Sequence, residues 1–209
     1  VTTEAYPYTA ASTSIGSAIF DEGCQERLGI SYGDVQWQDT GERLTEATFA
    51  RYRANDGVVI IHLMKEEWIE RALGNDWVMV ASDGMPYAPG AHPRTAGTFA
   101  RVLGRYVRER QVLDLPTAIA KMTLLPAQRL EGIAPQMARK GRVQEGADAD
   151  LTIFDPEAVI DTATFEGGLS FSGGIVHVLV GGVPVVADGE SVDGVFPGQA
   201  IRGRYSQDD

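Results

Sequence analysis

The chain has 209 residues, 44% of them hydrophobic, and a formal net charge of −11. This length and apolar content suit one large domain or two small ones, and they exclude a disordered chain. The negative charge argues against nucleic acid or an anionic membrane as partner, because their phosphates would repel it. No apolar stretch approaches the roughly 20 residues that a membrane span requires. The single cysteine, Cys24, excludes an internal disulfide and indicates a reducing, cytoplasmic setting.

The first eight residues read as a β-strand that begins without any preceding partner. Residues 1–8 are rich in β-branched and aromatic side chains, and they carry no charged or leader-like segment. A strand needs neighbours for its backbone groups, and none precedes this one. We therefore expect these residues to lie in the middle of a larger fold.

A long excursion, about residues 9–76, separates this strand from the next strong one. A helix is expected from Thr45, a strand over 58–64 and an amphipathic helix over 65–73. Because long ordered insertions in compact domains are often functional, we interpret the excursion as a lid. His62 lies in an apolar run, which favours a core histidine over a metal ligand.

The run 78–81 predicts a buried strand that ends in an acid and a glycine, Asp83 and Gly84. Residues at the carboxyl ends of strands line the ligand crevice of α/β folds, so Asp83 is a candidate for chemistry. The alternative is an N-cap or turn aspartate, since Asp-Gly is a common turn pair. His92-Pro93-Arg94 follows a loop rich in proline and glycine, and then a helix is expected over 97–111.

The last third of the chain changes from helix to strand patterns. A second helix opens at Leu115-Pro116, where proline suits the first turn. From Gly141 onwards, glycine, aspartate and proline separate short apolar runs at 150–155, 175–180 and 183–187. Gly181-Gly182 has the spacing of a hairpin turn. We place a boundary near residue 140, between an α/β part and a β part.

Several motifs carry a resemblance to a known family. They are residues 141–155 and the shorter runs Tyr6-Pro7-Tyr8-Thr9-Ala10, Ser82-Asp83-Gly84, His92-Pro93-Arg94, Gly97-Thr98-Phe99 and Ala163-Thr164-Phe165-Glu166. Together they resemble the carboxy-terminal part of the N-acyl-D-amino-acid deacylases, or D-aminoacylases, which are metal-dependent amidohydrolases. The tail over 194–203 resembles the N-acyl-D-glutamate deacylases within that family.

The resemblance implies an α/β fold made of two parts. Residues 1–140 would be the carboxy-terminal portion of an amidohydrolase TIM-type barrel, with the lid-like segment at about 9–76 inserted. Residues 141–209 would be part of a small β-sandwich domain. A complete barrel takes about 250 residues, so the amino-terminal half of the barrel is expected as an upstream partner.

The resemblance also implies a zinc-dependent hydrolysis of N-acyl-D-amino acids. Asp83 matches the acid that closes the last barrel strand, where it would bind the zinc ion, take a proton from the attacking water and return it to the leaving amine. Arg94 would bind the substrate's α-carboxylate, for which a planar guanidinium is suited. Tyr6 and Ser12 fall where the family places hydroxyls near that carboxylate. The alternatives are a surface arginine at position 94 and ordinary turn residues at positions 6 and 12.

The histidines and the cysteine that bind zinc in the family have no matching residues in this chain. Its three histidines, His62, His92 and His177, are scattered, and Cys24 lies in the excursion. Three hypotheses therefore stay open. The chain is the carboxy-terminal piece of a zinc D-aminoacylase, or a non-catalytic scaffold that lost its ligands, or a metal-free hydrolase that uses Asp83 with His92. These hypotheses are distinguished by measuring the zinc content and the turnover of the chain, first alone and then together with an upstream half of the barrel.

Overall fold

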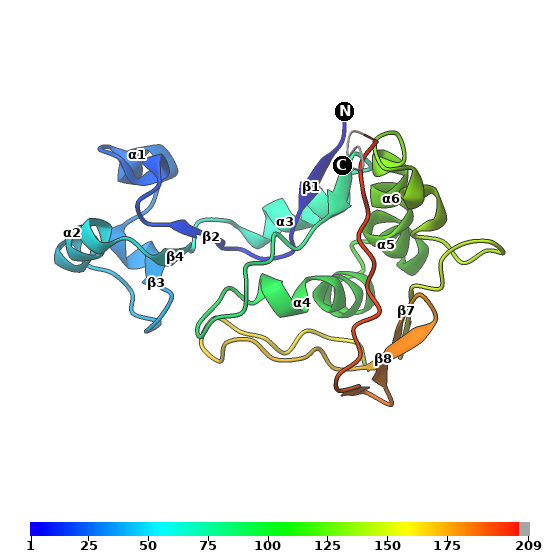
Figure 1. Ribbon diagram of the computed structural model, residues 1–209. Coiled ribbons are helices and arrows are strands. Elements are labelled where there is room, and N and C mark those ends of the chain that lie inside the picture. Colours follow the sequence, from blue (N-terminus) through cyan, green and yellow to red (C-terminus); the bar gives the residue numbers. More distant parts are fainter. Residues whose placement is uncertain (205–209) are drawn as a thin grey trace.

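The computed structural model describes residues 1–204, and a parallel pair of strands lies at its centre (Figure 1). Strands β1 (Thr3–Ala5) and β5 (Val78–Val80) pair in parallel. Parallel neighbours need a crossover connection, and helix α3 (Glu66–Leu73) provides it, with buried Ile69 and Leu73 packed in one cluster with Val80. The carboxyl ends of β1 and β5 therefore meet at the same edge of the pair.

A group of helices follows β5 and covers it. These are α4 (Arg94–Arg101), the π-helical segment η3 (Val102–Glu109), α5 (Leu115–Met122), α6 (Leu124–Leu130) and the short η4 (Pro135–Arg139). Buried Val102 and Tyr106 of η3 share the cluster that holds Leu73 and Val80. Helix α5 begins as its sequence predicts, since the Asp114 carboxylate accepts a hydrogen bond from the Thr117 N–H (2.7 Å) and proline occupies the first turn.

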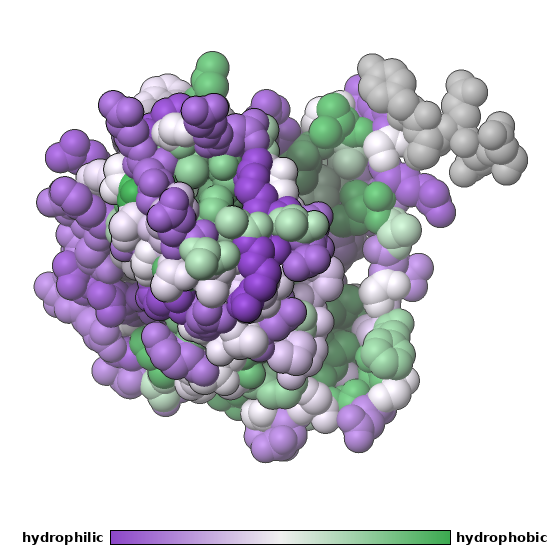
Figure 2. All heavy atoms as spheres, turned by 90° about the vertical axis from the view of Figure 1, so that its left-hand side faces the viewer, coloured by the Kyte–Doolittle hydropathy of each residue, from purple (hydrophilic) through white to green (hydrophobic). Residues whose placement is uncertain are grey.

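The excursion contains a small sheet with its own hydrophobic core. Its strands β2 (Ala11–Ser14), β4 (Val58–Ile61) and β3 (Val35–Trp37) pair antiparallel in the order β2-β4-β3. The helical pieces are η1 (Ala18–Phe20), α1 (Cys24–Leu28), η2 (Tyr32–Asp34) and α2 (Glu46–Asn55). In Figure 1 this unit stands to the left of the helices, and its outer face is largely hydrophilic (Figure 2). The helix expected from Thr45 and the strand expected from Val58 are confirmed.

Helix α3 lies outside this small core, although the sequence analysis counted it within the excursion at 9–76. Its buried residues Ile69 and Leu73 face β5 and η3, whereas the core of the excursion runs from Ile15 to Ile61. The reason is the amphipathic pattern of α3, which buries one face against the parallel strands. The division of the chain into domains, and the lid role of the excursion, stay predictions.

The carboxy-terminal part is an antiparallel sheet, as the strand patterns predict. Its strands β6 (Leu151–Phe154), β7 (Ile175–Val180), β8 (Val183–Ala187) and β9 (Glu190–Ser191) pair in chain order. Gly181 and Gly182 have positive φ, 56° and 81°, a left-handed conformation that glycine adopts without steric cost, so they form the tight turn of the β7–β8 hairpin.

Buried side chains join this sheet to the helices. Ala100 and Leu103 pack with Val159, and Phe154 and Ile175 lie against the same cluster. The mixed helix and strand content agrees with the expected α/β class, while the barrel and the sandwich stay predictions. None of the helices within residues 1–204 has the length and apolar character needed to cross a membrane.

Gly104 allows η3 to approach the segment before β7 closely, and this gives a test of the packing. A Cβ added there would lie 2.5 Å from both the Val159 carbonyl oxygen and Ile160 Cδ1. Helix propensity alone favours Gly104→Ala by about 1 kcal/mol, but overpacking costs about 1–3 kcal/mol. We therefore expect Gly104→Ala to lower the free energy of unfolding of the full-length protein, measured by denaturant titration.

The matched control is Gly132→Ala, in the turn after α6, where an added Cβ meets no atom within 4 Å. This variant should leave the stability close to that of the wild type. A Gly104→Ala protein more stable than the wild type would contradict the close approach of η3 to residues 159 and 160.

Candidate active site

The four residues proposed from the sequence meet at the carboxyl edge of the parallel strands. Tyr6 directly follows β1, and Asp83 lies three residues beyond β5. Ser12 is the second residue of β2, and Arg94 is the first residue of α4. Because β1 and β5 are parallel neighbours, the segments that leave them open onto one side. The fold thereby brings together residues that are up to 88 positions apart, from Tyr6 to Arg94.

Arg94 is the centre of this group. Its Nε donates to the Asp83 carbonyl oxygen (2.8 Å), and its Nη2 lies 2.9 Å from Asp83 Oδ2 and 3.5 Å from the Ser12 carbonyl oxygen. Its guanidinium carbon lies 4.6 Å from the centre of the Tyr6 ring, a cation–π distance. The side chain is only 1% exposed. A buried cation needs such partners, since an unpaired one is costly.

Asp83 has a strained backbone and an accessible carboxylate. Its φ is 47°, a left-handed conformation that is uncommon outside glycine and is tolerated best by Asp and Asn. Its side chain is 66% exposed although it pairs with buried Arg94. Strained residues of this kind cluster at functional sites. Asp83 therefore presents a solvent-accessible carboxylate beside the buried guanidinium of Arg94.

Two hydroxyls complete the group. Burial raises the pKa of the Tyr6 phenol, and the Arg94 guanidinium opposes that rise, so Tyr6 is a neutral hydrogen-bond donor at physiological pH. The Ser12 hydroxyl oxygen is buried and has no hydrogen-bond partner among the described residues. An unpaired buried polar atom calls for an explanation, and a ligand that accepts or donates a hydrogen bond at Ser12 is one.

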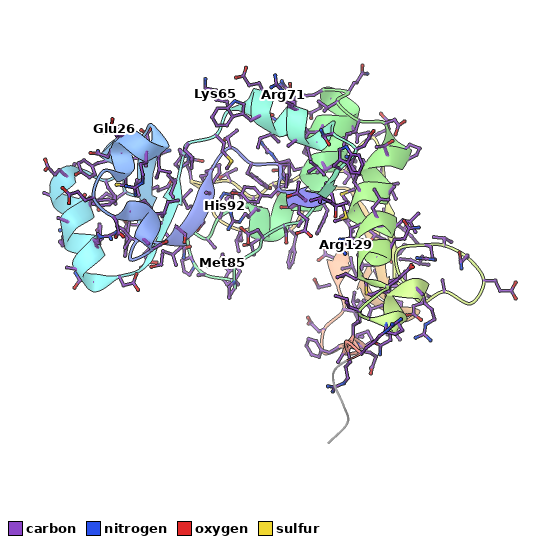
Figure 3. All side chains as sticks on the ribbon, turned by 90° about the horizontal axis from the view of Figure 1, so that it is seen from above. Glu26, Lys65, Arg71, Met85, His92 and Arg129 are labelled. Atoms are coloured by element: carbon purple, nitrogen blue, oxygen red, sulfur yellow. The ribbon has the colours of Figure 1, made fainter. Side chains whose placement is uncertain are left out.

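His92 lies between the excursion and α4 (Figure 3). Both of its ring nitrogens form hydrogen bonds with the backbone. Its Nδ1 accepts from the Arg94 N–H (3.1 Å), so its Nε2 carries the proton and donates to the Ala10 carbonyl oxygen (2.9 Å). The residue is fully buried, and burial lowers its pKa to about 3. His92 is therefore not placed to exchange protons with a substrate, and the metal-free hypothesis that pairs it with Asp83 is not supported.

The other histidines and the cysteine also lie away from this group. His62 is half-buried, and its Nε2 lies 2.9 Å from Gln36 Oε1. His177 lies on β7, where its Nδ1 accepts from the Asp188 N–H (3.2 Å). Cys24 is buried in the core of the excursion. Within residues 1–204, no three His, Cys, Asp or Glu side chains come together to hold a metal ion, so these residues alone do not fit a zinc site.

A second arginine repeats the contacts of Arg94, and the sequence analysis missed it. Arg101 lies seven residues further along α4, two turns away on the same face. Its Nε donates to the Pro7 carbonyl oxygen (2.7 Å), its Nη1 lies 2.9 Å from Asp161 Oδ2, and its guanidinium carbon is 4.6 Å from the centre of the Tyr8 ring. The sequence holds a signal for this arrangement: two tyrosines two residues apart, Tyr6 and Tyr8, and two arginines seven residues apart, Arg94 and Arg101.

Phe165 was also missed as part of the core around the site. Its ring meets His92 edge-on at 5.0 Å between centroids and His62 at 4.9 Å. It lies in the motif 163–166, which carries part of the family resemblance. No local pattern connects Phe165 with a histidine more than 70 residues earlier, since this contact depends on the tertiary fold.

Comparison with known proteins shows the family of the chain. The chain belongs to the amidohydrolase family, whose model matches residues 33–186. It is 37% identical over 193 residues to the N-acyl-D-glutamate deacylase of Alcaligenes xylosoxydans xylosoxydans, an alignment that covers 88% of this chain and 38% of the relative. It is 36% identical to the D-aminoacylase of the same organism, with the same two coverages, 88% and 38%.

A solved structure shows the same relationship. The crystal structure of the N-acyl-D-glutamate deacylase from Bordetella bronchiseptica, complexed with zinc and a phosphonate inhibitor, superposes with a TM-score of 0.71 at 35% identity, covering 91% of this chain and 41% of that one. The resemblance to the N-acyl-D-amino-acid deacylases is thus confirmed, and these relatives are hydrolases. The chain spans about two fifths of their length.

Proposed function

We propose that this chain is the carboxy-terminal part of a zinc-dependent N-acyl-D-amino-acid deacylase, which hydrolyses the amide to a carboxylate and a free D-amino acid. The observation that carries the proposal is the group around Arg94. A buried guanidinium, an exposed carboxylate and two hydroxyls converge at the carboxyl edge of β1 and β5. This combination suits a substrate with a carboxylate beside a hydrolysable bond.

Each residue has a distinct role in the proposal. Asp83 takes a proton from the attacking water and returns it to the leaving amine, as general base and then general acid. Arg94 binds the α-carboxylate through its planar guanidinium. Tyr6 and Ser12 donate hydrogen bonds to the same carboxylate. The accessible carboxylate of Asp83 and the unpaired hydroxyl of Ser12 support these roles.

Zinc and the rest of the fold belong to the same proposal. When bound, zinc polarises the amide carbonyl and activates water. Since residues 1–204 bring no three ligands together, we place most of the ligands in an upstream part of the protein, with Asp83 as the acid that this chain contributes. We further propose that β1, β5 and the helices complete a TIM-type barrel with that part, and that the sheet β6–β9 belongs to a β-sandwich.

The substrate and the compartment belong to the same proposal. The tail over 194–203 favours N-acyl-D-glutamate among possible substrates, because it resembles the glutamate deacylases. The cytoplasm is the proposed compartment, because the single cysteine is free and buried.

Metal removal tests the proposal directly. We expect the full-length protein to release free amine from N-acetyl-D-glutamate, to lose this turnover after treatment with a chelator, and to regain it with zinc. The L-enantiomer serves as the control substrate. A fully zinc-loaded protein without turnover on any N-acyl-D-amino acid would contradict the proposal and favour the alternative, a non-catalytic scaffold of the same fold.

The proposed upstream partner gives a second test. Among the described residues β1 and β5 pair only with each other, and Phe171 and Phe196 are 89% and 91% exposed. Open strand edges and exposed apolar side chains promote association. We therefore expect residues 1–209 produced alone to self-associate, as measured by light scattering. A monodisperse monomer with a cooperative unfolding transition would contradict this expectation.

A further inference from the structure

His92 connects the two segments that carry the proposed substrate-binding residues. Its Nδ1 bonds to the backbone N–H of Arg94, the first residue of α4, and its Nε2 bonds to the carbonyl oxygen of Ala10. Ala10 lies between Tyr6 and Ser12, both of which contact Arg94. The imidazole therefore links the backbone of Arg94 to the segment around Ala10, whose neighbours Tyr6 and Ser12 contact the Arg94 side chain.

Aromatic rings enclose the imidazole on several sides. Tyr6, Tyr8 and Phe165 meet it edge-on, at 6.0, 5.4 and 5.0 Å between centroids. The side chain is fully buried. A ring held in this way has one available orientation, so its two hydrogen bonds have fixed directions.

We infer that His92 is a positioning residue, which aligns the Arg94 guanidinium with Tyr6 and Ser12 for binding the substrate's carboxylate. The inference rests on the proposed function, in which Arg94 binds that carboxylate. His92 itself does not touch the substrate. It acts by fixing the segment around Ala10 against the start of α4, because a small displacement of either would move Arg94 away from Tyr6 and Ser12.

Two simpler roles for His92 make different predictions. As a cap of α4, it would matter through Nδ1 alone, because that nitrogen accepts the N–H of the first helical residue. As a filler of the core, it would matter through the volume of its ring. In the positioning role the bond from Nε2 to Ala10 is decisive, since it reaches the second segment.

Two substitutions separate these roles. The amide of asparagine reaches the position of Nδ1, and that of glutamine reaches the position of Nε2. His92→Asn thus retains the bond to Arg94 and loses the bond to Ala10, while His92→Gln retains the bond to Ala10. His177→Asn, on β7, is the matched control at a histidine outside the site.

We expect His92→Asn in the full-length, zinc-loaded enzyme to raise KM for N-acetyl-D-glutamate about tenfold, with kcat within about twofold of the wild type. His92→Gln should raise KM less, and His177→Asn should leave both constants unchanged. In an Arg94→Lys background, His92→Asn should cause little further increase, because coupled residues are not additive. For the substrate's α-amide, the effect of His92→Asn on KM should shrink.

A spectroscopic measurement tests the geometry without any turnover. Long-range proton–nitrogen correlation spectra of the ¹⁵N-labelled enzyme, assigned by the signal that His92→Asn removes, should show His92 protonated at Nε2 and unprotonated at Nδ1. A ring protonated at Nδ1 would overturn the inference.

The kinetic results can overturn the inference in two further ways. A KM increase for His92→Gln with none for His92→Asn would assign a capping role alone, and equal KM values for all variants would assign a packing role alone. In either case the wild-type enzyme still turns over, so the proposed function stands. Failure of the proposed function is distinguishable, because the wild-type enzyme would then hold zinc without turnover, and the inference would fall with it.

Discussion

Asp83→Asn is expected to lower turnover of the full-length, zinc-loaded enzyme by about 100-fold or more, the usual contribution of general acid-base catalysis. An asparagine cannot take up and return the proton. It should preserve the local structure, because Asn tolerates the left-handed backbone at position 83, where φ is 47°. The bond from Arg94 Nε to the carbonyl oxygen of residue 83 does not involve the carboxylate. The loss should therefore appear in kcat, measured by release of free amine.

The control for this variant is Asp161→Asn. Asp161 forms the equivalent ion pair with Arg101, also at 2.9 Å, but lies outside the proposed site. The Asp161→Asn substitution should change the free energy of unfolding more than it changes kcat. If Asp83→Asn retained near-normal kcat, the assignment of Asp83 as the proton carrier would be wrong.

Arg94→Lys is expected to act mainly on substrate binding. Lysine keeps the positive charge but loses the planar, two-pronged contact with a carboxylate. A hydrogen bond to a charged group is worth about 1.5–3 kcal/mol, so KM for N-acetyl-D-glutamate should rise roughly 10- to 100-fold. The increase should shrink for the α-amide of the same compound, which lacks the carboxylate. Steady-state kinetics on both compounds measure the difference.

Arg101→Lys is the matched control, because Arg101 contacts a carbonyl oxygen, a carboxylate and a tyrosine ring as Arg94 does. The Arg101→Lys substitution should lower the stability, and it should not raise KM for N-acetyl-D-glutamate more than KM for the α-amide. An Arg94→Lys enzyme with the same KM increase for the acid and its amide would refute the role of Arg94 in binding the α-carboxylate.

Local patterns predicted most of the secondary structure. The apolar run before Asp83 forms β5, the pattern near Thr45 forms α2, and Gly181-Gly182 forms a hairpin turn. These features depend on neighbours in the sequence, such as a cap, a turn or an alternation of apolar residues. The position of α3 could not be predicted from local patterns. Its amphipathic sequence predicts that one face is buried, but it does not identify the strands against which that face packs.

Asp83 was a candidate from its place at a strand end, and Arg94, Tyr6 and Ser12 were candidates from the family resemblance, while the catalytic roles of all four stay predictions. The fold adds that these residues surround the buried guanidinium of Arg94, and that His92 bonds to the backbone of Ala10 and Arg94. The physical reason is that parallel pairing of β1 with β5 brings distant strand ends to one edge. Such pairing depends on contacts across the whole chain, which no local pattern encodes.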